Sequence, residues 1–417
     1  MNIPSPAAVP AQRLPRNVKI LGLASLLNDI ASEMIFPLLP AFLITVLPGS
    51  RFSLGVIEGA ADSVASLLKL WSGGWSDQAG RRKGFVLFGY SLAAVTRPLL
   101  AAALAPWQVF AIRVSDRVGK GVRTAPRDAL IADSTGAAIR GRAFGFHRAM
   151  DHLGAAVGPL LAAGFLWLWP GQFRALFLIT VVPGLLVVAL LIVGLRETPA
   201  TGPPKERLRL TLRPFGRDFR LLLLALVVFT LGNSSDAFLL VRARELGVPT
   251  GRLPLLWCAF HVAKSSGNLL LGRAVDRVGP RPFLFLGWFV YAAVYLAFAL
   301  ATDAWQAWAL FLAYALFYGL AEPAEKTLVA NLAGAEGKGL AYGWYNFAIG
   351  VTTFPSSLIF GALYQYTGAL AAFGWGAGLA FVAAALLAAV KGRPMPPAAR
   401  TAGVNPAARK GQGGPPG

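Results

Sequence analysis

The feature that most constrains the fold is a series of long apolar segments that recurs about twelve times along the 417 residues. Each is about 20 residues or longer, which is the helix length needed to cross the hydrocarbon core of a bilayer. Within lipid a backbone must satisfy its own hydrogen bonds, so such segments are helical. We therefore predict an all-α membrane protein with twelve spans, at residues 17–47, 53–78, 84–104, 106–133, 141–168, 173–195, 219–241, 253–275, 282–301, 304–333, 339–366 and 369–390.

Composition agrees with this class, because 56% of the residues are apolar and only 14% are charged. The net charge of +20 comes mainly from bases in the tails and in alternate loops. That pattern follows the positive-inside rule and predicts that both termini are cytoplasmic in a multi-pass protein of a bacterial inner membrane. There is no basic, aromatic-rich domain, so we expect the lipid bilayer and no nucleic acid as a partner.

The two halves of the chain resemble each other when the sequence is shifted by about 198 residues. Trp107-Gln108 then falls on Trp305-Gln306, and GRAFGF at 141–146 falls on GLAYGW at 339–344. Two pseudo-symmetric six-helix bundles follow. The predicted organisation is an N-terminal tail at 1–16, a bundle at 17–195, a cytoplasmic linker at 196–218, a second bundle at 219–390 and a disordered tail at 391–417.

The predicted span 106–133 carries an unusual number of charges. Its charged positions from 113 to 127 lie within roughly 120° of one another on a helix, so they form one stripe. At about 2.5 to 3.5 kcal/mol per charge near the bilayer centre, these side chains must face protein or water. The stripe is either a transport pathway or a set of interior ion pairs, neutralised by Asp29, Glu33, Asp116, Asp128 and Asp151.

Several motifs resemble those of the major facilitator superfamily (MFS). The segment GGWSDQAGRRK at 73–83 is similar to the family's loop motif between its second and third helices, and GRAVDRVGPR repeats it in the second half. Gly145, Gly154, Gly158 and Pro159 match the spacing of the family's antiporter motif, although Ala162 and Ala163 replace the last two glycines of that motif. The run DRVGKGVRTAPRDAL at 116–130 is similar to a largely uncharacterised prokaryotic branch.

This resemblance implies the MFS fold, alternating access and a cytoplasmic latch. The latch would comprise Gly73, Asp77, Gly80, Arg81, Arg82, Asp133 and Asp276, with Asp133 as the partner of Arg81. A simpler interpretation is that the three bases at 81–83 only follow the positive-inside rule.

We expect proton coupling at Asp29 and Glu33, which are one helical turn apart near the middle of the first span, with Arg113 and Asp116 nearby. Two close carboxyl groups resist ionising together, so one can load and release a proton. A structural ion pair with the span 106–133 is the alternative. Glu58 and Asp62 are expected nearer the outer end of their span, as gate or surface groups.

A central substrate cavity and an inner gate complete the predicted site. Polar or aromatic residues at interior depth are the cavity candidates: Asn28, Arg117, Lys120, Arg148, Asp151, Asn233, Asp236, Lys264, Trp344 and Asn346. The inner gate would pair Arg123 and Arg127 with Glu322 and Glu325, because the shift by about 198 residues places Arg127 on Glu325. Structural pairing, for example of Asp236 with Lys264, is equally compatible with the sequence.

No nucleotide-binding or hydrolytic motif is present, and the chain has three histidines and one cysteine. We therefore expect no enzyme activity, no metal and no cofactor, with a proton gradient as the energy source. The favoured function is proton-coupled antiport, in the export direction, of a small organic molecule by a monomer. The alternatives are a uniporter or proton symporter of an organic anion, and a membrane sensor that transports nothing.

Overall fold

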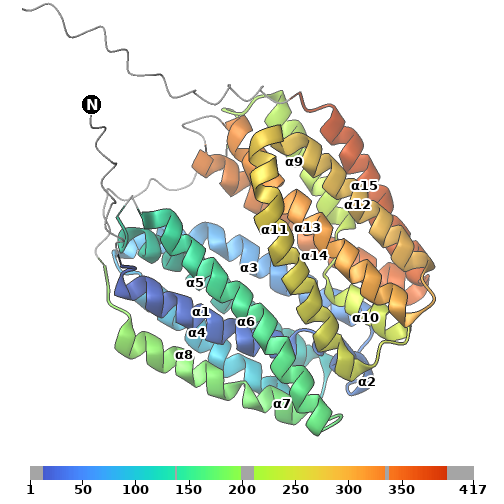
Figure 1. Ribbon diagram of the computed structural model, residues 1–417, viewed down its shortest axis with the longest axis horizontal. Helices are drawn as coiled ribbons and strands as arrows, with labels where there is room; N and C mark the ends of the chain where they lie inside the picture. Colours follow the sequence, from blue (N-terminus) through green and yellow to red (C-terminus); the bar gives the residue numbers. More distant parts are fainter. Residues whose placement is uncertain (1–12, 137–138, 199–210, 334–337, 392–417) are drawn as a thin grey trace, which may run out of the picture.

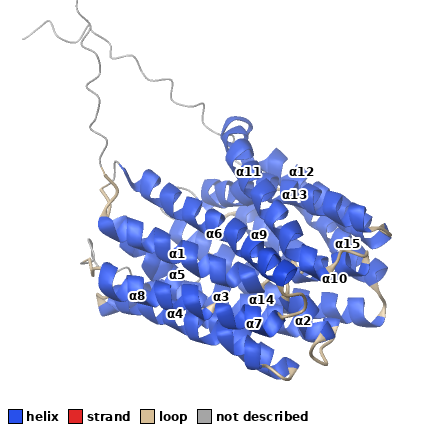
Figure 2. Ribbon diagram, turned by 60° about the horizontal axis from the view of Figure 1, so that its bottom comes forward, coloured by secondary structure: helices blue, strands red, loops and turns tan. Residues whose placement is uncertain are grey.

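The computed structural model describes residues 13–136, 139–198, 211–333 and 338–391, except for a few side chains in two helices. These residues form helices and loops with no strand among them (Figure 2). The helices are α1 Arg16–Ile35, α2 Leu39–Thr45, α3 Arg51–Ala79, α4 Lys83–Thr96, η1 Arg97–Ala102, α5 Pro106–Asp133, α6 Arg140–Leu168, α7 Phe173–Ile179, α8 Val181–Gly194, α9 Arg217–Gly232, α10 Ala237–Glu245, η3 Thr250–Arg252, α11 Leu253–Val278, α12 Pro280–Leu300, α13 Ala304–Ala333, α14 Lys338–Tyr366 and α15 Ala369–Ala388.

Nine helical segments of the described chain are long and apolar enough to cross a membrane. The long helices α3, α5 and α11 are not among them, and each has charged residues along its length. Three predicted spans are each interrupted. The span 17–47 breaks into α1 and α2 at Pro37, which has no amide hydrogen to donate, and the other two break between α7 and α8 and between α9 and α10.

The helices form two bundles, which we call the N-lobe (α1 to α8) and the C-lobe (α9 to α15) (Figure 1). We call the face at which α1 begins and α15 ends the terminal face, and the other the opposite face. At the terminal face Asn17, near the start of α1, donates to the carbonyl of Arg196, just after α8, at 2.9 Å. In the C-lobe Arg281, at the start of α12, donates to the carbonyl of Ala388 at the end of α15.

The internal repeat is visible in local structure. Gln108 accepts hydrogen bonds from the amides of the residues three and four positions before it, at 3.1 and 2.6 Å. Gln306 does the same in the C-lobe, at 3.0 and 2.7 Å. Prolines also recur inside equivalent helices, at Pro126 in α5 and Pro323 in α13. The all-α fold of two related bundles, predicted from the sequence, is confirmed.

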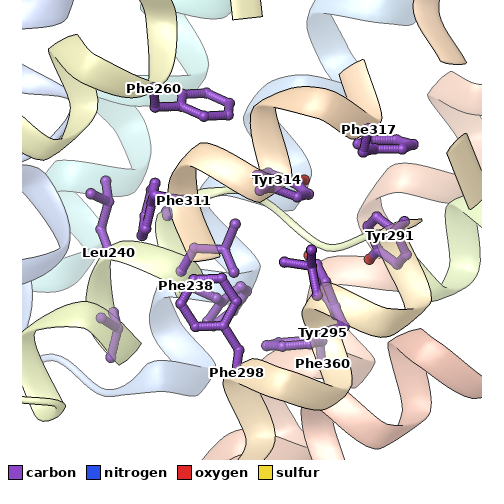
Figure 3. Packing of buried hydrophobic residues seen from close by; sticks show 14 of the residues in the cluster. Phe238, Leu240, Phe260, Tyr291, Tyr295, Phe298, Phe311, Tyr314, Phe317 and Phe360 are labelled. Atoms are coloured by element: carbon purple, nitrogen blue, oxygen red, sulfur yellow. The ribbon is translucent and has the colours of Figure 1, made fainter. Parts of the chain in front are cut away.

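The two lobes have different interiors. In the C-lobe, aromatic rings from α10 to α15 fill the centre, as Figure 3 shows for Phe298, Tyr314 and Tyr295. Tyr291 and Tyr295 stack with their centroids 4.0 Å apart. In the N-lobe, glycines bring helices together: a Cβ added to Gly89 of α4 would lie 2.4 Å from the carbonyl oxygen of Gly119 in α5. This close packing positions α5, which carries the charges.

Candidate functional site

A cavity of about 630 Å³ lies between the two lobes. Its wall comes from α1, α3, α5 and α6 of the N-lobe and from α11 and α13 of the C-lobe. On α5 and α13 the lining residues, from Lys120 to Asp128 and from Glu322 to Lys326, belong to the half of each helix nearer the terminal face. The cavity therefore lies in the half of the molecule that is nearer the terminal face.

The cavity wall is highly charged. In the described part of the chain seven Lys or Arg and five Asp or Glu line it, which leaves an excess of two positive charges. The bases are Lys69, Lys120, Arg123, Arg127, Arg148, Lys264 and Lys326, and the acids are Asp29, Glu33, Asp128, Asp151 and Glu322. Such an arrangement can hold an anionic or dipolar molecule in water-filled space.

Nearer the opposite face, away from this cavity, the two lobes are in direct contact. A Cβ added to Gly55 of α3 would lie 2.3 Å from the carbonyl oxygen of Ser357 in α14, so the two helices touch through their backbones. Arg51 at the start of α3 pairs with Glu245 at the end of α10. The hydroxyl of Tyr364 donates to the same carboxylate at 2.6 Å. We call Arg51, Glu245 and Tyr364 the opposite-face clasp.

The clasp was not predicted from the sequence. Arg51 and Glu245 lie near helix ends, where a charged residue is usual, and they are separated by 194 positions. Only the pairing of α3 with α10 brings them together. The lobes are therefore closed at the opposite face, and the cavity is reached from the terminal face.

The charges of α5 form a buried ion network with acids and a base of other helices. Arg113 binds Glu58 of α3 through two bonds of 2.9 and 2.8 Å, and both side chains are buried. Asp116 accepts from Arg97 of η1 at 2.9 Å. Each of these four charges lies beside an opposite one, as buried ions require.

This network corrects the predicted neutralising set. Glu58, expected as a gate or surface group, is fully buried beside Arg113. Asp62 pairs with Arg117 at 3.3 Å. Of the acids expected to neutralise the stripe, Asp116 belongs to the network and Asp128 pairs with Arg127. Asp29, Glu33 and Asp151 line the cavity, and no ion pair joins them to α5 among the described residues. These pairs depend on how α3 packs against α5, which the periodicity of the sequence does not reveal.

The four residues predicted for proton coupling therefore separate into two places. Arg113 and Asp116 belong to the buried network, whereas Asp29 and Glu33 line the cavity. Asp29 accepts from the side chain of Asn28 at 2.9 Å. Glu33 accepts from the indole of Trp257 in α11 at 2.7 Å, so this carboxylate of the N-lobe binds the C-lobe.

The predicted substrate residues also divide. Asn28, Lys120, Arg148, Asp151 and Lys264 line the cavity. The remaining five lie elsewhere. Arg117 is buried in the ion network, Asn233 and Asp236 line a second, smaller pocket, and Trp344 and Asn346 of α14 lie outside the lining of both cavities.

The contacts of Trp344 and Asn346 explain why these residues lie outside both cavities. Trp344 packs edge-on against Phe347 at 5.7 Å, and Asn346 donates to the carbonyl of Tyr342 at 2.7 Å. These contacts are packing within the C-lobe and do not form a wall of either cavity. Lys69, His152 and Asn268 line the large cavity and were not predicted, since isolated polar residues in a span give no signal of their direction.

The structure corrects one pair of the predicted latch. Arg82, and not Arg81, is the partner of Asp133, and it also binds Asp77 at 2.9 Å. Arg82 is buried and Arg81 is exposed. Gly80 ends α3 in the left-handed region with φ of 61°, a conformation that favours glycine and turns the chain toward α4.

The structure says less about two other candidates for the latch, Gly73 and Asp276. Gly73 of α3 faces α5, where a Cβ would lie 3.4 Å from the side chain of Ala125. Asp276 belongs to α11, and its side chain lies outside the described residues.

The four residues of the predicted inner gate have partners within their own lobes. Arg123 donates to the carbonyl of Gly89 at 3.2 Å and lies over the ring of Tyr90, and Arg127 binds Asp128. Glu322 binds Lys326 at 3.0 Å, and Glu325 accepts from Tyr345 at 2.9 Å. In this conformation the structure does not bring the four together. A gate between them stays a prediction for a state in which this end is closed.

The glycines of the antiporter-like motif place α6 against α1. A Cβ on Gly154 would lie 2.6 Å from the carbonyl oxygen of Leu26, and one on Gly158 would lie 2.6 Å from that of Ile30. Gly145 has open space around it, and Pro159 lies inside α6. The motif thus brings α6 close to the helix that carries Asp29 and Glu33.

Two helical lobes around a polar cavity that is closed at one end define a membrane transporter. Sequence comparison then gives the family: the model of the Major Facilitator Superfamily matches residues 21–259 and 221–412. The chain belongs to this superfamily.

Similar proteins agree with this assignment. The chain is 31% identical to an uncharacterised MFS-type transporter of Methanocaldococcus jannaschii over 90% of its own length and 95% of that protein. It is 25% identical to the class G tetracycline resistance protein of Vibrio anguillarum, over 82% and 88% of the two chains. A bacterial homologue of the human lysosomal transporter Spinster, solved in an inward-facing and occupied conformation, has the same fold with a TM-score of 0.70. The identity there is 17%, and the match covers 89% of this chain and 95% of that one.

Proposed function

We propose that this protein is a proton-coupled antiporter that exports a small organic molecule by alternating access. The terminal face is then cytoplasmic, in agreement with the basic tails and loops. One observation carries the proposal: Glu33 lines the large cavity and at the same time accepts a hydrogen bond from Trp257 across the lobes. The resemblance to a tetracycline resistance protein supports export.

The geometry at Glu33 couples a proton to the movement of the lobes. Its carboxylate accepts the indole hydrogen of Trp257 at 2.7 Å, and the Nε2 atom of His261 is 3.9 Å away. A carboxylate is a stronger acceptor than a neutral carboxyl group, because hydrogen bonds to charged groups are roughly twice as strong. Releasing a proton into the cavity therefore strengthens this contact between the lobes, which keeps the opposite face closed while cargo enters from the terminal face.

The proposal is tested in proteoliposomes that contain the purified protein and a pH-sensitive dye. A panel of organic solutes, including tetracycline, is added with and without an imposed pH gradient. We expect at least one solute to move against its gradient while protons move the opposite way. Glu33→Gln should abolish the proton flux but allow solute exchange, and Asp303→Asn, an exposed acid in the loop before α13, should behave as the wild type. Solute accumulation by Glu33→Gln driven by the pH gradient would refute the coupling role.

The cavity charge favours a second candidate, the transport of an organic anion by uniport or proton symport. Lys69 and Lys120 line the cavity, and neither forms an ion pair with a described residue. An anionic cargo would supply the missing charge. In the same vesicles, uptake of a carboxylate with protons moving in the same direction, or with no proton movement, indicates this alternative.

A further inference from the structure

A second pocket, of about 220 Å³, lies where α9 ends and α10 begins. Three acids line it: Asp62 from the N-lobe, and Asp236 and Glu325 from the C-lobe. Its other described lining residues are neutral, namely Leu226, Phe229, Thr230, Asn233, Ser234, Ser235, Tyr318, Ile349 and Thr353. No Lys, Arg or His is among them. The pocket therefore has the opposite charge to the large cavity.

Each acid is held in place, and two have no basic partner among the described residues. Asp236 accepts from the hydroxyls of Tyr314 at 2.8 Å and Tyr318 at 3.0 Å. Glu325 accepts from a tyrosine hydroxyl at 2.9 Å. Of the three, only Asp62 forms an ion pair with a described residue, Arg117 at 3.3 Å.

The next base, Lys264, is part of the large cavity. Its ammonium group lies 3.5 Å from the centre of the Tyr318 ring, whose hydroxyl binds Asp236. The Tyr318 ring therefore lies between Lys264 and Asp236, and a cationic face of one cavity adjoins an anionic face of the other.

The break between α9 and α10 leaves acceptor atoms without partners. Ser234 is 5% exposed and lines the pocket, and its Oγ atom forms no hydrogen bond with the described residues. The same holds for the buried Oδ1 atom of Asn233. Buried acceptors are normally satisfied, and here they occur beside carboxylates with no base. Interrupted helices in transporters supply oxygen ligands to cations in this way.

We propose that this pocket binds a small monovalent cation, either a protonated amine or an alkali-metal ion. Carboxylate, amide and hydroxyl oxygens are the ligands that hard cations prefer. The volume is several times the share of one water molecule, about 30 Å³, so it accommodates an alkylammonium group or an ion with retained waters. The rings of Phe229 and Tyr318 suit an ammonium group. Among the described residues no three His, Cys, Asp or Glu side chains lie close enough together to hold one metal ion, so a transition metal does not fit.

The test measures thermal unfolding of the full chain in lipid nanodiscs, in chloride salts of equal ionic strength. Sodium, lithium, potassium and methylammonium are compared with N-methyl-D-glucamine, a bulky cation that serves as the reference. We expect at least one of the four to raise Tm in a saturable manner, because a ligand that binds only the folded state stabilises it. A rise with methylammonium alone identifies the amine of a cargo as the source, and a rise with an alkali ion identifies a coupling ion.

Variants locate the binding. Asp236→Asn should lower the apparent affinity at least tenfold, and Glu325→Gln serves the same purpose if the first variant does not fold. The matched control is Glu322→Gln, one turn from Glu325 but in the large cavity with Lys326 as its partner. The proposal is overturned if no cation gives a saturable rise, or if both pocket variants respond as the wild type does. The measurement needs no gradient and no flux, so its failure is separate from a failure of the proposed transport.

Discussion

Removing the carboxylate of Glu245 should open the face at which the lobes meet. Glu245 holds Arg51 of the other lobe and accepts from the hydroxyl of Tyr364. The two charged side chains are 34% and 27% exposed, so the ion pair contributes only about 0.5 kcal/mol. The hydrogen bond from Tyr364 lies within the C-lobe, so it is kept when the lobes separate and does not count here. Glu245→Ala therefore shifts the closed-to-open equilibrium by about 0.5 kcal/mol, or about twofold.

The assay is the labelling of a buried reporter by a membrane-impermeant maleimide in intact cells. Cys258, the only cysteine, is first replaced by alanine, and Ser357→Cys then places a thiol where α14 touches α3. Ser357 is fully buried, so labelling reports opening at this face. We expect Glu245→Ala to raise the labelling rate about twofold. Asp303→Ala, which removes an exposed acid, is the control and should leave it unchanged. A labelling rate of Glu245→Ala equal to that of the control would mean that the ion pair does not hold the lobes together.

Two predictions concern buried charge in the N-lobe. Glu58→Gln leaves Arg113 without its main partner and should lower the free energy of unfolding by about 3 to 5 kcal/mol, measured by thermal melts in detergent. The double variant with Arg113→Gln should recover most of this loss. A single variant as stable as the wild type would contradict the ion network. Arg82→Ala should lower Tm and Arg81→Ala should not, because only Arg82 binds the acids of the latch. Equal shifts in Tm from the two variants would argue against the corrected pairing.

The fold could be predicted from the sequence because the signals that encode it are local and repeated. The apolar segments gave the helices, and the recurrence of Trp107-Gln108 as Trp305-Gln306 indicated two related bundles. The structure shows why these glutamines recur, since each binds the amides at the start of its helix. The breaks between α1 and α2 and between α9 and α10 were not predicted, because the residues that flank them are apolar enough to continue a span.

The site could be predicted only in part, because the partner of a buried charge is set by the packing of helices. Periodicity placed the bases of α5 on one face, yet it could not show that Arg113 meets Glu58 or that Arg82 takes the place expected for Arg81. Asp29 and Glu33 do line the cavity. The acidic pocket was missed because Asp62, Asp236 and Glu325 come from three different helices.

The ion network also bears on the order in which the protein is made. Three charges of α5, Arg113, Arg117 and Asp116, are compensated by groups that precede α5 in the chain, namely Glu58 and Asp62 on α3 and Arg97 on η1. When the ribosome releases α5, its counter-ions are already in the membrane. At about 2.5 to 3.5 kcal/mol for each unpaired charge, a helix with this many bases enters lipid at far lower cost beside them than alone. Synthesis from the N-terminus thus places the partners of Arg113, Asp116 and Arg117 in the membrane before α5 arrives.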